Sequence, residues 1–130
     1  MSTTVSALTR PRRLRPGDSV AVVAPSGPVP DDRLSAGVAI LCGWGLDVVL
    51  GEHVLDRHRE FDYLAGSDDH RAADLQRAWC DPAVAAVFCA RGGYGVQRMV
   101  DRLDWAAMAA ADPKILVGYS DITALHEAIA

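Results

Sequence analysis

Four short apolar segments recur along the chain, separated by longer stretches in which apolar residues return at helical spacing. The apolar segments are residues 19–24, 47–50, 84–90 and 115–117. Continuous apolar runs of this length, rich in β-branched residues, are typical of strands in a parallel sheet that is covered on both faces. The pattern therefore predicts four strands.

The stretches between these segments predict helices. The expected helices begin at Asp31 or Asp32, at Ser67, at Val96 and at Asp104, and the last covers residues 122–130. Strands and helices that alternate in this way are joined by right-handed crossovers and form a parallel sheet. The expected fold class is a three-layer α/β domain of the flavodoxin-like, doubly wound type, with the first strand at its centre.

One connection is too long for a simple turn. Residues 51–66 are polar and contain His53, His58 and Tyr63. Loops of this length in a small domain often border a binding site.

Composition and charge narrow the class of protein. The chain has 130 residues, half of them apolar, which suffices for one domain with a core. It has no apolar run of the ~18 residues that a membrane span needs and no apolar block near its start, so a cytoplasmic protein is expected.

The amino terminus is basic although the net charge is −4, because Arg10, Arg12, Arg13 and Arg15 precede the first acidic residue. Residues 1–15 are expected to be a flexible leader, and residues 16–130 the domain. Four arginines without interleaved aromatic residues on an acidic body do not favour nucleic-acid binding.

The three cysteines, Cys42, Cys80 and Cys89, are widely spaced in apolar surroundings. This spacing indicates reduced core cysteines rather than a disulfide or a zinc site. No cofactor is expected.

Ser120 is the strongest candidate for a catalytic residue. It follows the predicted strand 115–117 and Gly118, at the start of a predicted helix. A serine at such a corner is presented as a nucleophile, although the usual G-x-S-x-G pattern has glycine where this chain has Ile122. Alternatively, Ser120 or Asp121 caps the helix that follows.

Three loops should meet at the carboxyl edge of the sheet, where open α/β sheets bind ligands. They are residues 25–27, 91–95 and 118–121. If the third and fourth strands are neighbours, the amides of Gly93 and Asp121 could form an oxyanion hole beside Ser120. The glycine-rich turn 91–95 could instead bind phosphate, but it matches neither G-x-G-x-x-G nor a Walker loop.

The chain offers no clear base for Ser120. His126 lies six residues along the following helix and should point away, toward packing or the surface. His53, His58 and His70 have no acid at an informative spacing. Arg91 could bind a substrate carboxylate or pair with a surface acid, and Lys114 could belong to the rim or the plain surface.

Several ordered blocks resemble a known family. They are residues 14–18, 22–28, 63–67, 71–75, 90–95, 114 and 118–125. In this order they resemble the amino-terminal domain of the LD-carboxypeptidases, a family of serine peptidases that includes murein tetrapeptide carboxypeptidases and microcin-immunity peptidases.

The resemblance implies a cytoplasmic, metal-independent hydrolase that removes a terminal D-amino acid from L,D-peptides of peptidoglycan origin. It implies Ser120 as nucleophile, with the Asp121 amide and one from the Gly92–Gly93 turn as oxyanion donors. Arg91, Gly92 and Ser26 are expected to contact the substrate.

In the family, a carboxyl-terminal domain completes the site with a glutamate and a histidine. That domain is expected to be absent here, so the chain alone should be nearly inactive. Its uncovered surface should favour a homodimer or other self-association. The alternatives are a non-catalytic peptide-binding module anchored by Arg91 and, less favoured, a nucleotide-binding domain.

Overall fold

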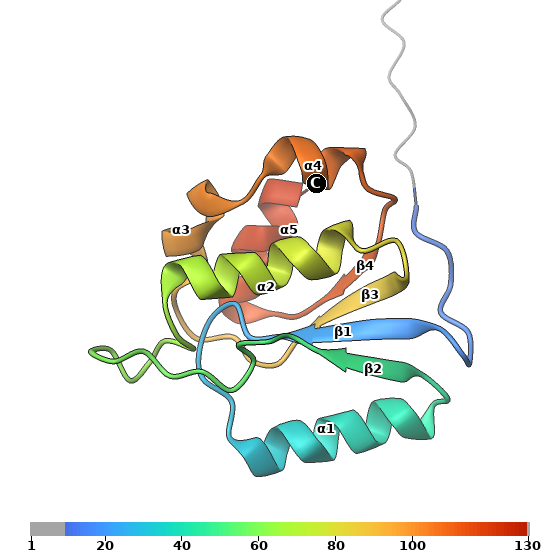
Figure 1. Cartoon of the computed structure of the whole chain (residues 1–130), viewed down its shortest axis with the longest axis horizontal. Coiled ribbons are helices and arrows are strands. Elements are labelled where there is room, and N and C mark those ends of the chain that lie inside the picture. The colour runs from blue at the N-terminus through green and yellow to red at the C-terminus, as the bar shows by residue number, and fades with distance from the viewer. Residues whose placement is uncertain (1–9, 130) are drawn as a thin grey trace, which may run out of the picture.

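A computed structural model describes residues 10–129 of the chain (Figure 1). The elements are β1 (Ser19–Val23), α1 (Asp31–Gly43), β2 (Asp47–Leu50), α2 (Asp68–Cys80), β3 (Val84–Cys89), α3 (Val96–Met99), a 3₁₀ turn (Val100–Arg102), α4 (Trp105–Ala110), β4 (Ile115–Val117), a second 3₁₀ turn (Ser120–Ile122) and α5 (Thr123–Ile129). The predicted alternation of strands and helices is confirmed.

The four strands form one parallel sheet in the order β2-β1-β3-β4. This order places β1 inside the sheet, as the sequence predicts, and makes β3 and β4 neighbours, which is the condition for the expected oxyanion hole. All carboxyl ends of the strands therefore lie at one edge, and the loops that follow β1, β3 and β4 can meet there.

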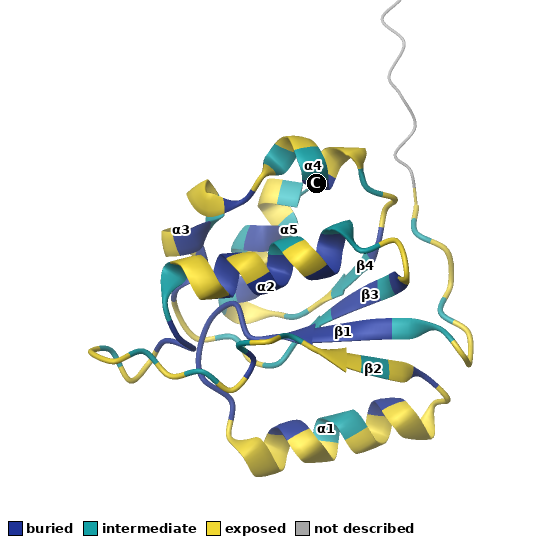
Figure 2. Ribbon diagram, viewed as in Figure 1, coloured by how far each residue is buried: buried dark blue, intermediate teal, exposed yellow. Residues whose placement is uncertain are grey.

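Helices cover both faces of the sheet, which confirms the three-layer α/β class. Successive side chains of β1 point to opposite faces, so Val20 and Val22 pack on the α1 side while Ala21 and Val23 pack with α2. Figure 1 shows α1 alone on one face and α2, α3 and α5 on the other. In Figure 2 the strands β1 and β3 form the buried centre of the molecule.

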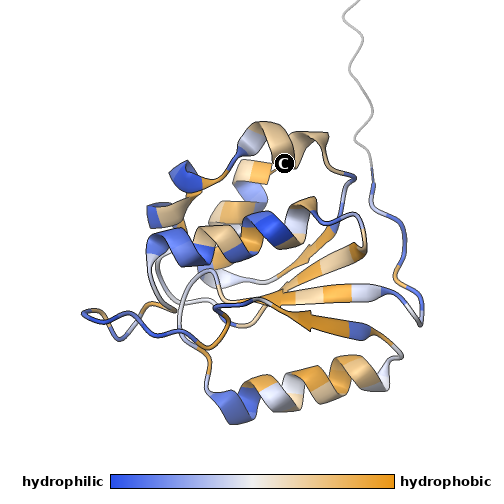
Figure 3. Ribbon diagram, viewed as in Figure 1, coloured by the Kyte–Doolittle hydropathy of each residue, from blue (hydrophilic) through white to orange (hydrophobic). Residues whose placement is uncertain are grey.

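The face covered by α1 alone is incompletely closed. A groove of about 770 Å³ lies between α1 and the ends of the strands. Its lining includes Ile40 and Trp44 of α1, both more than half exposed, and Phe88 of β3. In Figure 3 the strands and the middle of α1 are hydrophobic, whereas the start of α1 is hydrophilic.

The predicted helix from Val96 is shorter than expected. It ends at Met99 and passes through a 3₁₀ turn to Leu103, whose backbone is extended. Gln76 of α2 accepts a hydrogen bond from the Asp104 amide at 2.8 Å, and Asp104 caps α4 through the Ala107 amide. These contacts hold the start of α4, where the sequence also predicts a new helix at Asp104.

Two interpretations of single residues were wrong. Cys42 is exposed on α1 rather than in the core, while Cys80 and Cys89 are partly buried. Lys114 belongs neither to the rim nor to the plain surface. It is buried at the amino end of the sheet, where its ammonium group donates to the carbonyls of Asp81, at 2.7 Å, and Val84.

The predicted leader is only partly described, because residues 1–9 lie outside the described range. Within it, Arg12 pairs with Asp18 through two hydrogen bonds of 2.7 and 2.8 Å. Among residues 10–129, no helix is long and apolar enough to cross a membrane.

Candidate active site

Ser120 lies at a strained corner of the backbone. After β4 the chain passes through Gly118 and Tyr119, and Ser120 then adopts a φ of 62°. It is the only non-glycine residue with positive φ between residues 10 and 129. Such a conformation costs roughly 1–3 kcal/mol and is found preferentially at functional sites. The corner leaves Ser120 exposed at the carboxyl edge of the sheet.

Packing explains why this chain has Ile122 where the G-x-S-x-G pattern has its last glycine. Ile122 is fully buried, and a Cβ on Gly118 would lie 2.7 Å from its Cγ2 atom. Glycine at 118 therefore lets the chain turn sharply enough for Ile122 to enter the core. The corner keeps its shape with an apolar anchor at the fifth position.

The three predicted rim loops do meet. A Cβ on Gly92 would lie 3.0 Å from both the Cβ of Ser120 and the carbonyl oxygen of Tyr119. Gly27 donates its amide to the carbonyl of Gly92 at 3.1 Å, and a Cβ on Gly27 would lie 2.8 Å from that oxygen. The loops after β1, β3 and β4 thus contact one another through glycine backbone.

The side chain of Asp121 links the Ser120 turn to two neighbouring segments of the chain. Its Oδ2 accepts hydrogen bonds from the Ser26 hydroxyl at 2.5 Å and from the Val96 amide at 2.9 Å. Ser26 is fully buried. Within the described residues neither Ser120 nor Asp121 makes a side-chain capping bond to the helix that follows, so the capping interpretation was wrong. The carboxylate instead ties α3 and the β1 loop to the Ser120 turn.

The candidate oxyanion donors are free to donate. Between residues 10 and 129, the backbone amides of Gly92, Gly93 and Asp121 donate no hydrogen bond within the protein. Gly93 has a φ of 120° and lies next to Gly27 and Ser26, while its neighbour Gly92 lies next to Ser120. An amide without an internal partner is available to water or to a ligand.

Arg91 forms no ion pair with an acidic side chain among residues 10–129. Its guanidinium donates to the carbonyl of Pro28 at 3.0 Å, and its side chain passes 3.4 Å from the Cβ position of Gly27. Arg91, Gly92, Gly118 and Tyr119 line one end of the apolar groove. The groove therefore opens beside the Ser120 corner.

A buried arginine that the sequence analysis did not single out holds two of these loops. Arg71 of α2 is almost fully buried and donates to the carbonyls of Pro25 and Gly95 at 3.2 and 2.9 Å. It pairs with Asp68 at 2.7 Å, and its burial lowers the pKa of the guanidinium. The Asp68-x-x-Arg71 spacing on a predicted helix was an available signal for the pair.

The histidines do not supply a base to Ser120. His126 bonds to the carbonyl of Leu116 at 3.2 Å, which confirms its predicted packing role. His58 accepts from the amides of Glu60 and Phe61 within its own loop. No histidine hydrogen-bonds to Ser120 in residues 10–129.

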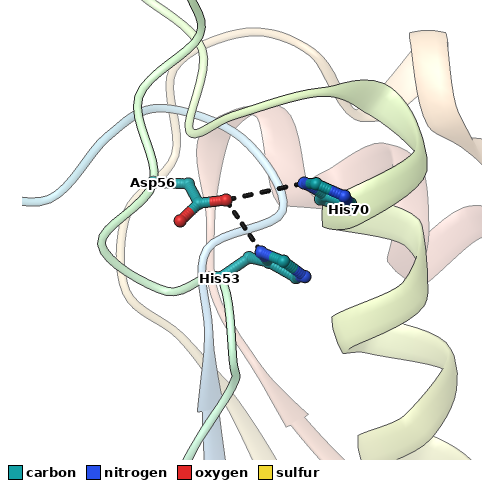
Figure 4. A group of neighbouring side chains, drawn as sticks. All are labelled: His53, Asp56 and His70. Carbon is teal, nitrogen blue, oxygen red and sulfur yellow. Dashed lines mark hydrogen bonds and ion pairs between the residues drawn. The ribbon is translucent and has the colours of Figure 1, made fainter.

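The long loop contributes to the same edge of the sheet. The ring of Tyr63 packs edge-on against Tyr94 of the 91–95 turn, with centroids 5.9 Å apart. The Ala65 amide donates to the carbonyl of Ser26 at 2.9 Å. His53 and Asp56 of this loop form a pair at 2.8 Å that the sequence analysis missed (Figure 4).

Comparison with known proteins gives matches along most of the chain. A protein of Streptomyces coelicolor named "Putative carboxypeptidase" is 72% identical over 95% of this chain and 40% of its own length. The murein tetrapeptide carboxypeptidase of Pseudomonas aeruginosa is 42% identical over 84% of this chain and 34% of its own. The chain thus spans about two fifths or less of the length of these relatives.

Solved structures of related proteins share the fold of this chain. The microcin C7 self-immunity protein in its wild-type apo state superposes with a TM-score of 0.82 at 29% identity, over 95% of this chain and 36% of that protein. The family model described as the LD-carboxypeptidase N-terminal domain matches residues 20–130. The chain therefore belongs to the LD-carboxypeptidase family and matches its amino-terminal domain.

Proposed function

We propose that Ser120 is the nucleophile of a serine LD-carboxypeptidase, and that this chain supplies the nucleophile and the oxyanion donors. The main support for this proposal is the positive φ of Ser120, which places an exposed hydroxyl where the loops after β1, β3 and β4 meet. A structural serine would not require a strained, exposed corner.

The oxyanion formed by attack of Ser120 would be bound by the amides of Asp121 and Gly93. Both lack an internal acceptor in the described residues. The Asp121 carboxylate is held by Ser26 and Val96, which fixes the backbone of the residue after the nucleophile. Preorganised donors of this kind contribute on the order of 100-fold or more to rate.

The substrate class follows from family membership and from the groove beside Ser120. A terminal D-amino acid would be cleaved from an L,D-peptide of peptidoglycan origin, as the names of the murein carboxypeptidase relatives suggest. Gly92 would border the scissile bond. Arg91, at the groove end, would attract the terminal carboxylate, while Ser26 acts through Asp121.

The base would come from the part of the family's proteins that residues 20–130 do not match. A serine without a base is a weak nucleophile. The chain by itself is therefore proposed to react slowly. The apolar groove with Trp44 and Tyr119 would favour self-association, or docking of the part of the family's proteins that supplies the base.

The same groove favours a second candidate, a peptide-binding module without catalysis. It offers apolar walls and two cationic groups, Arg33 and Arg91, and apolar walls with a few charged groups are the usual composition of a ligand site. Such a module would bind the same peptide but would not need the strained conformation of Ser120.

Labelling with a serine-directed phosphonate that mimics a D-alanyl terminus distinguishes the serine peptidase from the non-catalytic binding module. Mass spectrometry should locate the adduct on Ser120, with no adduct in Ser120→Ala and an unchanged adduct in Ser35→Ala, a matched exposed serine on α1. An adduct on another serine, or none in a longer protein that carries both domains of the family, would leave only the binding module.

A further inference from the structure

Two histidines and one carboxylate converge between the 51–66 loop and the start of α2. The Oδ2 of Asp56 lies 2.8 Å from Nδ1 of His53 and 3.6 Å from Nδ1 of His70. The two imidazole rings are stacked, with centroids 3.9 Å apart and planes inclined by 7°. Figure 4 shows both Nδ1 atoms directed toward the same carboxylate oxygen.

The backbone around these residues is fixed by contacts that do not involve the cluster. The His53 amide donates to Oδ2 of Asp74, a buried carboxylate of α2, at 2.8 Å. Gly66, with a φ of 90°, permits Asp56 to approach, since a Cβ there would lie 2.8 Å from the Cβ of Asp56. Ser67 caps α2 through the His70 amide at 3.1 Å. The donors are therefore held in place without a ligand.

The electrostatic surroundings favour a cation. A carboxylate oxygen of Glu52 lies 3.8 Å from Nε2 of His53, and Asp74 adds a carboxylate whose Oδ1 has no hydrogen-bond partner in the described residues. Arg77 pairs with Glu52 at 3.2 Å, and no lysine or arginine of the described residues forms an ion pair with Asp56. Two neutral imidazoles and a carboxylate are a donor set that transition metals prefer.

We propose that His53, Asp56 and His70 bind one divalent transition-metal ion, with Zn²⁺ as the best match. One donor atom from each residue lies within 4.8 Å of the others. Around a tetrahedral Zn²⁺ with bonds of about 2.1 Å, donors lie about 3.4 Å apart, so small side-chain shifts suffice. Three protein ligands leave the fourth position to water.

The ion would act on the loop rather than on Ser120. His53 and Asp56 come from the loop after β2, and His70 from the first turn of α2, so one ion cross-links the two elements. The far end of the same loop bonds to Ser26 through Ala65, and Leu64 packs against Gly95. Metal binding would stabilise the wall that supports the candidate active site.

The test is titration of the purified chain with ZnCl₂ by calorimetry and thermal unfolding, in a Cys42→Ser background that removes the exposed thiol. The expected result is one ion per chain and a rise in Tm of about 5 °C or more at ~100 times Kd. Asp56→Asn and His70→Ala should each weaken binding at least about 10-fold. The control His58→Ala, a histidine of the same loop, should bind as before.

A second readout identifies the ligands directly. Co²⁺ bound by histidine nitrogens gives visible absorption bands, which should appear in the parent and in His58→Ala and disappear in His70→Ala. His70 is exposed, so its removal should leave the fold intact, which far-ultraviolet circular dichroism checks. No saturable binding at ~100 µM Zn²⁺, or equal binding by the parent, Asp56→Asn and His70→Ala, would overturn the proposal.

Discussion

The two edges of this parallel sheet are built from different interactions. At the carboxyl edge, the backbone amides of Gly92, Gly93 and Asp121 and the exposed hydroxyl of the strained Ser120 make no hydrogen bond within residues 10–129. At the amino edge, Lys114 is buried and its ammonium group occupies the carbonyls of Asp81 and Val84. Polar groups at the amino edge are therefore satisfied within the protein, whereas those at the carboxyl edge are available to water or a ligand.

This division predicts that substitutions at the two edges have separable effects. Changes at the carboxyl edge should reduce reactivity more than stability, and changes at the amino edge should do the reverse. Reactivity here means turnover of an L,D-tetrapeptide by a protein that carries both domains of the family.

The largest effect is expected from Gly92→Ala. The new methyl group would lie 3.0 Å from Ser120 and from the Tyr119 carbonyl, so one of these must move. We expect turnover of an L,D-tetrapeptide to fall by about 100-fold or more because the nucleophile and oxyanion donors are displaced.

Gly43→Ala is the matched control for Gly92→Ala. A Cβ at Gly43, on α1 and outside the groove lining, has no atom within 4 Å. Its turnover should be unchanged and its free energy of unfolding up to about 1 kcal/mol higher, as for glycine replaced in a helix. Normal turnover in Gly92→Ala would contradict the proposed contact with Ser120.

The opposite pattern is expected from Lys114→Met. Two carbonyls would lose their donor in a buried position, which lowers the free energy of unfolding by about 2 kcal/mol. Urea unfolding measures this loss, while turnover per folded molecule should stay the same. A variant that kept its stability but lost turnover would show that the amino edge is not merely structural.

A smaller effect at the carboxyl edge is expected from Ser26→Ala. The hydroxyl is fully buried and donates to Asp121, so its removal should cost about 1–2 kcal/mol of stability. Turnover should fall roughly 10-fold, because Asp121 keeps only the Val96 amide. Ser35→Ala, on exposed α1, serves as the control, and equal turnover in both variants would remove Ser26 from the support of the site.

The smallest effect concerns Arg12 at the amino edge. Hydrogen bonds from Arg12 and then from the Arg15 amide lower the pKa of Asp18 to about 2. Because the folded pKa lies below the ordinary value of about 3.9, the pair stabilises the protein above pH ~4 and this contribution is lost as pH falls toward 2.

Arg12→Ala should raise the pKa of Asp18 toward its ordinary value and flatten this acid dependence. Carboxylate titration by NMR measures the change, and Arg13→Ala is the control. An Asp18 pKa that stays near 2 in Arg12→Ala would assign the shift to the Arg15 amide alone.

The fold was largely predictable because its rules are local and general. Apolar runs fixed the strands, and right-handed crossovers placed β1 inside a parallel sheet. The end of α3 at Met99 was not predicted, because the apolar spacing of Val96, Met99, Val100 and Leu103 continues through the 3₁₀ turn.

The candidate site was predictable only where it follows a strand. Ser120, Gly92 and Gly93 come directly after β4 and β3, so topology alone brings them together. The pairing of His53 with Asp56 depends on how the long loop folds over Asp74 and Gly66, which no periodicity encodes. Arg71 reads as an ordinary helix residue until its buried carbonyl partners are known.

The most direct test of the central claim is release of D-alanine from an L,D-tetrapeptide. The assay compares the 130-residue chain, a version extended to the length of its relatives, and Ser120→Ala in both. The account predicts little or no release by the short chain, turnover by the extended one, and loss of that turnover in Ser120→Ala. Turnover that persists in extended Ser120→Ala would contradict Ser120 as the nucleophile.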